Sequence, residues 1–336
     1  MLIPPAYEPV PIRINPHVDM AKSDLLGHLD TVLDFGGKSP MLVREVITKG
    51  QPWLSLAMNM PRAKPDVLCT VTRLITLIYI ADLLDESPDV TSQAFARHAR
   101  TSMHALTTGR PAGGALDAQA ALHGKKLRSL VTPLQFERFV SAATSWALAT
   151  TAEFDIRDST PSLNDYFIIR TESKASGDVC ASLLELQYDE EIDPLLWNSP
   201  ACRAAREASK IALVIDNDIY SRPREKNDPH AMPTCVDILI AEGLSEDDAV
   251  DVLIAWRDSA VRLIESIRDT AEGTAKNLYE DLLNQVLMAP RYYAIVGLYA
   301  GLESLRFTPT SSHSMTPMEL PGFSWVWGCL RNPEDP

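Results

Sequence analysis

Four residues with oxygen-donor or cationic side chains lie close together in the second half of the chain. Asn217, Ser221 and Glu225 are each four residues apart, and Lys226 follows directly. Side chains four residues apart on an α-helix share one face, so the amide, hydroxyl and carboxylate would form one column, the Asn-Ser-Glu stripe. Hard oxygen ligands of low charge suit Mg²⁺ whose coordination is completed by phosphate oxygens, and Lys226 could bind the same anion. Taken alone, the pattern also fits a polar helix end that faces solvent.

A second acidic cluster ends an apolar helical segment. The stretch "ITLIYIADLLDES" is almost wholly apolar as far as Asp82, and Asp85 and Glu86 follow on the same helical face. Carboxylates at the end of a core-facing helix are costly unless they are exposed or bind a cation. The two clusters together favour a metal site, with a solvated helix end as the alternative.

The composition of the chain is that of a globular protein. Its 336 residues, 46% of them hydrophobic, can bury a large core. The net charge of −14 argues against a nucleic-acid surface, because duplex binding depends on neutralising phosphates with lysine and arginine. We therefore expect no nucleic-acid partner, and an anionic ligand would need metal ions or a few well-placed cations.

Cysteine usage and the apolar stretches bear on the cellular compartment. The five cysteines are an odd number without short spacing, which argues against a disulfide framework or a zinc knuckle and favours buried thiols in reducing surroundings. The start of the chain lacks the basic residues and apolar run of a signal peptide. The most apolar stretch, "LITLIYIADLL", is too short to span a bilayer. We expect a cytoplasmic protein without membrane insertion.

The elements that must position these residues are predicted to be helices. Apolar residues recur at three- and four-residue spacing in long segments, and alternating strand-like runs are absent. These segments are residues 20–35, 65–87, 133–154, 201–220 and 245–273. Pro65 suits a first helical turn, and Ser245 followed by acidic residues suits a helix amino terminus. The pattern predicts a single all-α domain of roughly ten or more helices.

The stretch "NDIYSRPRE", from Asn217 to Glu225, completely matches the pattern (N/D)D(L/I/V)x(S/T)xxxE, and Lys226 follows it. In this motif, and in two upstream helical segments, the chain resembles the class I terpene synthases, in particular the single-domain bacterial and fungal terpene cyclases. The resemblance covers roughly residues 14–307 and implies a helical bundle around a central apolar cavity. Residues 1–13 would form an N-terminal extension, and residues 308–336 an irregular C-terminal tail.

The resemblance implies a Mg²⁺-dependent terpene synthase. Such an enzyme ionises a linear prenyl diphosphate, most often farnesyl diphosphate, cyclises the resulting cation and releases diphosphate, which makes it a carbon–oxygen lyase. Three Mg²⁺ ions would bind with the diphosphate, and Mn²⁺ could substitute for them. The implied metal ligands are Asn217, Ser221, Glu225, Asp82, Asp85 and Glu86. The resemblance leaves a homodimer open.

The resemblance also implies three cationic contacts to the substrate diphosphate. Arg170 lies 47 residues before the stripe, where the family has an arginine that contacts diphosphate, and Lys226 adjoins the stripe. These two are the expected catalytic residues. The nearby Ser176-Gly177 pair suits a helix break that the family has in this region. Arg306 lies near, but not in register with, the family's final Arg-Tyr pair. Without the resemblance, Arg170 would be interpreted as a surface residue.

Besides the missing Arg-Tyr pair, a second feature departs from the family pattern. The family's aspartate-rich motif begins with an aspartate that bridges metal ions, but this chain has Ala81 there. Asp82 is rotated by about 100° from position 81, whereas Asp85 shares its face, so Asp85 is the preferred surviving ligand. Weak or lost ionisation is therefore an alternative interpretation, as are a synthase for geranyl or geranylgeranyl diphosphate and a helical scaffold that lost the chemistry. Pro223 lies inside the stripe and should bend the helix or begin its end.

A cyclising cation must be kept from water, so the implied reaction needs an apolar cavity with aromatic walls. Candidate wall residues lie near the motifs and on a late helix, and each of them also fits an ordinary core position. These candidates are Ile78, Tyr79, Phe167, Leu213, Tyr292, Tyr293 and Tyr299.

Overall fold

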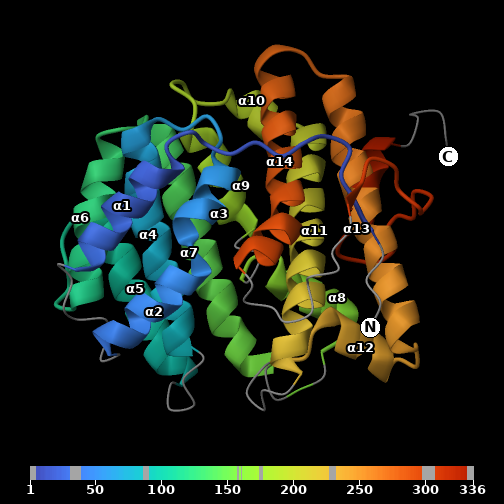
Figure 1. The fold of residues 1–336 in the computed structure, drawn as a ribbon, viewed down its shortest axis with the longest axis horizontal. Helices are drawn as coiled ribbons and strands as arrows, with labels where there is room; N and C mark the ends of the chain where they lie inside the picture. Colours follow the sequence, from blue (N-terminus) through green and yellow to red (C-terminus); the bar gives the residue numbers. More distant parts are fainter. Residues whose placement is uncertain are drawn as a thin grey trace. The chain divides into compact units, whose positions relative to one another are not determined.

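The computed structural model describes most of the chain. The described residues are 5–30, 39–85, 91–156, 159, 161–173, 177–226, 232–296 and 307–330, without the side chains of residues 81–85, 155, 224, 294, 307 and 329–330. Helices make up nearly all of the regular structure, which confirms the predicted all-α fold (Figure 1). The chain divides into two compact units. Unit 1 comprises Met1–Ile12, Ile156–Ala181 and Ile192–Pro336, and unit 2 comprises Arg13–Asp155 and Ser182–Glu191.

Unit 2 is built from the helices of the first half of the chain. They are α1 (Val18–Leu29), α2 (Pro40–Gly50), α3 (Pro52–Asn59), α4 (Pro65–Asp85), α5 (Ser92–Thr108), α6 (Ala115–Arg128) and α7 (Pro133–Ile156). Helix α4 packs against α1, α3 and α6, and α5 packs against α6. Leu68, Val71 and Leu74 of α4 are buried in this core. Pro65 is the first residue of α4, as its fixed φ angle predicts.

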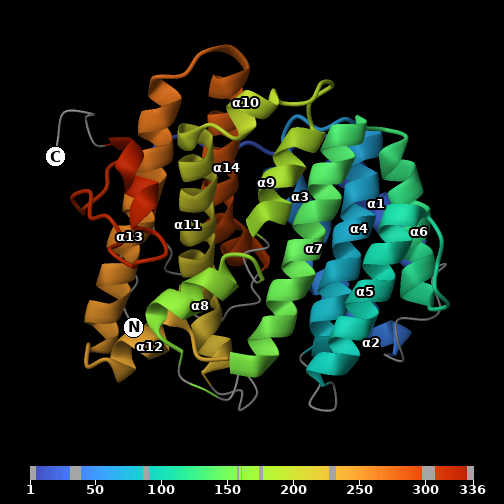
Figure 2. The ribbon, with the colours of Figure 1, turned by 180° about the vertical axis from the view of Figure 1, so that it is seen from behind.

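Unit 1 is built mainly from the second half of the chain. Its elements are β1 (Ala6–Tyr7), α8 (Leu163–Arg170), α10 (Pro194–Trp197), α11 (Pro200–Glu225), α12 (Cys235–Ala241), α13 (Glu246–Asp269), α14 (Gly273–Val296), β2 (Phe307–Thr308) and the 3₁₀ helix η2 (Ser324–Leu330). Helix α9 (Gly177–Leu186) begins in unit 1 and ends in unit 2. Helices α11, α13 and α14 pack side by side, as Figures 1 and 2 both show.

Side-chain caps set the starts of the helices that carry the site. The hydroxyl of Ser199 accepts a hydrogen bond from the amide of Cys202 at the start of α11, with Pro200 in the first turn. Ser245 caps α13 in the same way, and Glu246 begins an acidic first turn that complements the helix dipole, as predicted. Helix α11 passes through Pro223 and ends two residues later, at Glu225.

The amino-terminal segment belongs to unit 1, where hydrogen bonds join it to β2, α13 and α14. Ala6 and Tyr7 pair in parallel with Phe307 and Thr308, and these two-residue strands are the only sheet in the described residues. The carbonyl of Tyr7 accepts a hydrogen bond of 2.7 Å from the buried Arg257 of α13. Two hydrogen bonds of 2.8 Å join the guanidinium of Arg291 on α14 to the carboxylate of Glu8.

The C-terminal segment, predicted to be irregular, packs onto the same unit. The amide of Gly322 donates to Asn164 of α8 at 2.8 Å, and Phe323 makes an edge-on ring contact with Phe167. Helix η2 packs against α11 and buries Val326 and Trp327.

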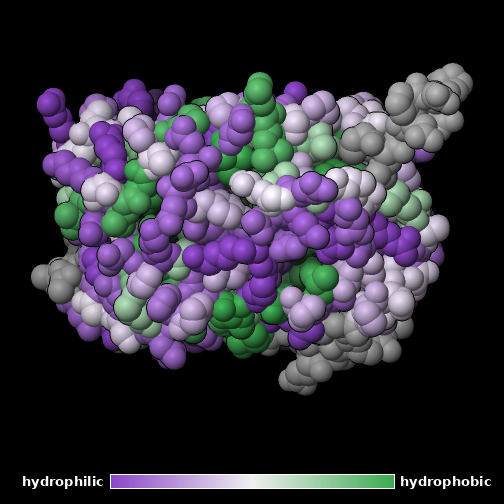
Figure 3. Space-filling model, turned by 90° about the horizontal axis from the view of Figure 1, so that it is seen from above, coloured by the Kyte–Doolittle hydropathy of each residue, from purple (hydrophilic) through white to green (hydrophobic). Residues whose placement is uncertain are grey.

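The visible surface is mixed in polarity. In the view of Figure 3, hydrophilic residues predominate and the hydrophobic residues form separate patches. No helix in the described part of the chain combines the length and the apolar character needed to cross a membrane.

Candidate functional site

The Asn-Ser-Glu stripe lies on α11, which is continuous across all three residues. Asn217 is partly buried, and its Nδ2 donates a hydrogen bond of 3.0 Å to the hydroxyl of Tyr293 on α14. Ser221 is 1% exposed, and its Oγ has no hydrogen-bond partner within the described part of the chain. Glu225 is partly exposed at the last turn. One face of the helix therefore presents an amide, a hydroxyl and a carboxylate, as predicted.

The donor atoms of the stripe are suited to a metal ion. A buried hydroxyl without a partner costs on the order of 1–3 kcal/mol, so the free Oγ of Ser221 favours a ligand that would satisfy it. The other donors on this face are an amide and one carboxylate, which are hard oxygen ligands suited to Mg²⁺. Among the described residues, no group of three or more His, Cys, Asp or Glu side chains could hold a metal. A site with a single carboxylate needs anionic oxygens from a substrate, and the stripe fits a cation on that condition.

Three consecutive residues of α11 contact three different helices, because successive side chains point about 100° apart. Asp216 faces Arg257 of α13, with its carboxylate 3.4 Å from Nε. Asn217 contacts α14, as described above. Asp218 faces α8, where Arg170 Nη2 lies 3.3 Å from Oδ1 and the Tyr166 hydroxyl donates to Oδ2 at 2.5 Å. These contacts fix the rotation of α11 and hence the direction of the stripe.

Arg170 lies in a buried ion pair beside the stripe. It is 4% exposed at the last turn of α8, and the guanidinium lies 5.6 Å from the ring centre of Tyr166. Asp218, its partner, also accepts a hydrogen bond of 2.9 Å from the amide of Cys235. Burial, with the neighbouring carboxylate of Asp218, raises the pKa of the Tyr166 hydroxyl well above its ordinary value. The structure thus brings the predicted Arg170 to the helix of the stripe, as Figure 2 shows for α8 and α11.

Two residues of this arrangement were missed by sequence reasoning. Asp218 stands second in the quoted motif, which was the available signal, but its partners come from α8 and α12. Asp216 gave no signal beyond its charge. Burial raises the pKa of Asp216 to about 6, although the nearby Arg257 guanidinium acts in the opposite direction. Asp216 and Asp218 are the sequence neighbours of Asn217, the first residue of the stripe, and both are fully buried.

Lys226 and a neighbouring arginine behave differently at the end of α11. Arg222 is buried, lies 2.9 Å from the carboxylate of Asp237 and contacts that of Glu246. The side chain of Lys226 is 59% exposed, and its Nζ lies 3.7 Å from Glu246. Arg222 therefore joins α11 to α12 and α13, whereas Lys226 extends into solvent near Glu225.

The second predicted cluster belongs to α4. Asp82 and Asp85 lie in its last turn, but their side chains, like that of Ala81, are not among those described. Glu86 lies outside the described residues, as do Tyr299, Arg306 and Ser176. Helix α8 ends at Arg170 and α9 begins at Gly177, so the chain does break its helix in the predicted region.

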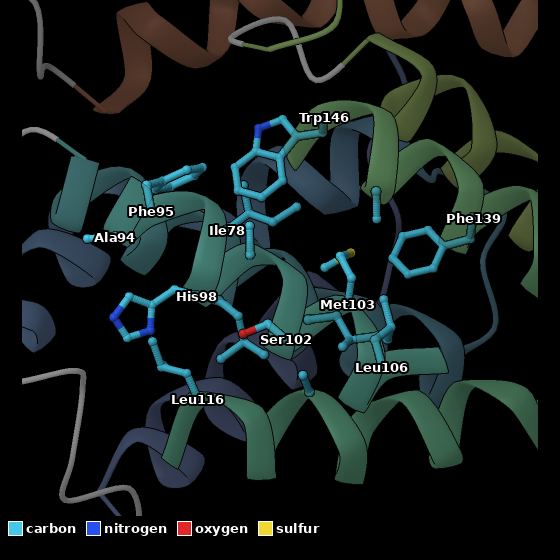
Figure 4. A pocket seen from close by; sticks show the side chains of 15 residues that line it. Ile78, Ala94, Phe95, His98, Ser102, Met103, Leu106, Leu116, Phe139 and Trp146 are labelled. Atoms are coloured by element: carbon cyan, nitrogen blue, oxygen red, sulfur yellow. The ribbon is translucent and has the colours of Figure 1, made fainter. Parts of the chain in front are cut away.

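An apolar cavity of about 180 Å³ lies within unit 2 (Figure 4). Its walls come from α4, α5, α6 and α7, and the Ser102 hydroxyl on the wall donates to Asp117 at 2.9 Å. Among the predicted wall residues, Ile78 lines this cavity. The lining side chains include Ile78, Phe95, His98, Ser102, Met103, Leu106, Leu116, Ala120, Phe139, Ala143 and Trp146.

Of the other predicted wall residues that the structure describes, four belong to unit 1 and one, Tyr79, belongs to unit 2. Phe167 is fully buried and contacts the rings of Trp256 and Phe323. Leu213 and Tyr292 are buried, and the ring of Tyr292 contacts that of Tyr293. Tyr79 is partly buried on α4 of unit 2 and does not line the cavity of Figure 4.

Comparisons with known proteins agree with this architecture. The family model described as terpene synthase family 2, C-terminal metal binding, matches residues 74–262, more than half of the chain. Bonnadiene synthase of Allokutzneria albata is 25% identical over 292 residues, which cover 80% of this chain and 72% of that protein. A 4-epi-cubebol synthase of Streptosporangium roseum, described as cyclising (2E,6E)-farnesyl diphosphate, is 24% identical over 280 residues, covering 81% and 83%.

Solved structures share the fold. The crystal structure of the SVS_A2 protein, from ancestral sequence reconstruction, superimposes with a TM-score of 0.80 at 22% identity over 97% of this chain and 99% of that one. Hedycaryol synthase in complex with nerolidol gives a TM-score of 0.70 at 17% identity, over 88% and 99%.

Proposed function

Because the chain belongs to terpene synthase family 2 and has the class I fold, we propose that it ionises and cyclises farnesyl diphosphate in a Mg²⁺-dependent reaction. Membership of the family makes it a terpene synthase with a divalent-metal site; the ion, the substrate and the residues are our proposal. The farnesyl chain length is supported by the relative described as cyclising farnesyl diphosphate. Geranyl and geranylgeranyl diphosphate are the alternative substrates.

The observation that carries the proposal is the Asn-Ser-Glu stripe with its unpartnered Ser221 hydroxyl. We propose that Asn217, Ser221 and Glu225 hold one Mg²⁺ ion. Asp82, Asp85 and Glu86 are the proposed ligands for the remaining ions, with Asp85 preferred because position 81 is an alanine. Bound Mg²⁺ supplies Lewis-acid stabilisation of the charge that develops on the departing diphosphate oxygens.

The proposed roles of the protein's own cations follow from their surroundings. Arg170 is oriented by its buried partner Asp218 and would donate to the diphosphate from a fixed position beside the stripe. Lys226 is exposed and only loosely paired with Glu246, so it can turn toward an incoming anion. We keep Arg306 as a third proposed diphosphate contact. None of these residues forms a covalent bond to the substrate.

The hydrocarbon part of the substrate needs walls that exclude water, because an allylic cation reacts readily with it. The aromatic residues Phe167, Tyr292 and Tyr293 are the proposed stabilisers of positive charge in unit 1. A synthase with weak ionisation remains the second candidate, and the observation that favours it is Ala81 in the aspartate-rich motif. The cytoplasmic location and a homodimer stay predictions.

The decisive experiment is incubation of the protein with C10, C15 and C20 prenyl diphosphates, with Mg²⁺ or with a chelator, and analysis of volatile products by mass spectrometry. We expect Mg²⁺-dependent cyclic products from the C15 substrate. Glu225→Gln should abolish turnover, because it removes the only carboxylate of the stripe. Product formation that survives chelation, or near-normal activity of Glu225→Gln, would rule out the stripe as the metal site.

A further inference from the structure

A buried lysine with three carboxylate partners lies on α11, two turns before the stripe. Lys210 is 6% exposed, and its Nζ lies 3.1 Å from Asp178 and 3.3 Å from Glu207 and also contacts Glu172. Burial alone would lower the pKa of Lys210, but the three carboxylates outweigh burial and hold it above its ordinary value. Lys210 is therefore charged at neutral pH.

Two of the three carboxylates come from the break between α8 and α9. Glu172 follows the last turn of α8, which ends at Arg170, and Asp178 is the second residue of α9. Glu207 differs, because it lies three residues before Lys210 on α11 itself. Lys210 thus ties both sides of the helix break to the helix of the stripe.

The packing around Gly177 makes this connection close. The amide of Gly177 donates to the carbonyl of Thr171 at 3.0 Å, which folds the start of α9 back onto the end of α8. A Cβ atom at position 177 would lie 2.0 Å from that carbonyl oxygen and 2.6 Å from Cδ of Lys210. Only glycine fits between the break and the lysine stem.

Lys210 shares the helical face of the stripe, because positions 217 and 221 lie seven and eleven residues after it and each points within about 20° of the direction of Lys210. A buried ion pair contributes little net stability, because the cost of removing charges from water offsets their attraction. Its effect is instead to fix the geometry of the groups that it joins. Here those groups are the end of α8, which carries Arg170, and α11, which carries the stripe.

We propose that Lys210 is a positioning residue that holds Arg170 and the Asn-Ser-Glu stripe in register by joining the α8–α9 break to α11. This inference rests on the proposed function. It adds a residue that does not contact the diphosphate but acts on it through Arg170 and the stripe. Misplacement of a binding group by about 1 Å can lower a rate by about 100-fold, so a small shift of Arg170 would suffice.

The three carboxylates provide a matched test. Glu172→Gln and Asp178→Asn each remove a link between the break and Lys210, whereas Glu207→Gln removes only a contact within α11. We expect at least a tenfold fall in kcat for the first two, with a smaller change in KM, and a change of less than twofold for Glu207→Gln. Equal losses in all three variants, or none in any, would overturn the proposal.

Two further measurements separate positioning from folding and from failure of the proposed function. Lys210→Arg should recover most of the activity that Lys210→Met loses, because arginine can still bridge the break. Hydrogen exchange at the Gly177 amide should quicken in Glu172→Gln and Asp178→Asn and stay unchanged in Glu207→Gln, whether or not the protein makes a terpene. Unchanged exchange in all three variants would show that Lys210 does not hold the break. If wild-type protein makes no product while the exchange difference is present, the proposed function fails and the connection itself stands.

Discussion

Single residues on α11 owe their roles to the direction in which each side chain points. Asp216, Asn217 and Asp218 are adjacent in sequence, yet they contact α13, α14 and α8 respectively. The two aspartates are buried and paired, and they anchor the helix. Asn217 and Ser221 are the residues left to face a ligand. A substitution on this helix should therefore affect either stability or metal dependence, depending on which of these sets it removes.

Ser221→Ala should separate metal binding from stability. The Ser221 hydroxyl is buried without a described partner, so its removal should leave the stability of the free protein unchanged or raise it by about 1 kcal/mol. The Mg²⁺ concentration for half-maximal activity should rise several-fold. Ser209→Ala is the control, because Ser209 donates to Gln285 at 3.2 Å and should lose stability without a change in Mg²⁺ dependence. Titration of activity with Mg²⁺ and urea unfolding measure both effects.

Arg170→Ala should destabilise the fold as well as reduce activity. Removing one member of a buried pair leaves an uncompensated charge, and the fully buried Asp218 would lose the guanidinium that balances it. We expect a loss of roughly 3 kcal/mol in the free energy of unfolding. Arg44→Ala, which breaks an exposed pair with Asp30, should cost less than about 1 kcal/mol. Equal losses in the two variants would show that Arg170 is not held as described.

Among the elements, α1 and α6 meet through two histidines. His123 Nε2 lies 3.2 Å from His28 Nε2, and the rings meet nearly at right angles. Burial, then the charges of His28 and Arg73, lowers the pKa of His123 to about 4, and burial also lowers that of His28. Asp24 acts in the opposite direction on both rings. The contact between these helices therefore requires neutral imidazoles.

This contact predicts a loss of stability in mild acid. A histidine whose folded pKa lies below its unfolded value of about 6.5 binds fewer protons when folded, so its contribution is complete above that pH and falls toward pH 4. The fall should amount to as much as about 3 kcal/mol for His123. His123→Gln should flatten the profile of melting temperature between pH 7 and 4, and His104→Gln, at an exposed position of α5, should leave it unchanged. An identical profile for both variants would contradict the assignment.

The sequence predicted the elements better than the contacts between them. Periodic apolar residues, Pro65 and Ser245 specify helices locally, so α4, α7, α11 and α13 and the column of the stripe could be predicted. The partners of Asp218 and Lys210 depend on how α8 and α9 dock on α11, which no local pattern encodes. The same holds for the cavity of unit 2, whose walls come from four helices. The metal ligands and diphosphate contacts stay predictions.

At the scale of the whole molecule, the apolar cavity of unit 2 leaves space between four helices that side chains do not fill. Apolar side chains that face such a space lack packing partners on that side, so a larger side chain on the wall should gain contacts. This wall includes Ala120, whose neighbour Ala121 is equally buried but does not line the cavity. These two adjacent alanines allow the void to be tested within one turn of α6.

Ala120→Leu should stabilise the protein and Ala121→Leu should destabilise it. The first adds carbon atoms to empty space and should contribute about 1 kcal/mol, whereas the second overpacks a filled region at a cost of about 1–3 kcal/mol. Calorimetry of both variants checks the sign. A loss of stability in Ala120→Leu equal to that of Ala121→Leu would show that the cavity collapses in solution.

The pairing of Ala6 and Tyr7 with Phe307 and Thr308 has a consequence for biosynthesis. Unit 2 is nearly continuous in sequence, so it can form on the ribosome, but the strand that carries Tyr7 must wait until its partner about 300 residues later has been translated. At about 5–20 residues per second, this delay is roughly 15–60 s. Until their partners have been translated, Tyr7 cannot bind Arg257 of α13 or pair with β2, and Glu8 cannot bind Arg291 of α14. Chaperones and proteases therefore meet a nascent chain whose first segment is among the last to dock.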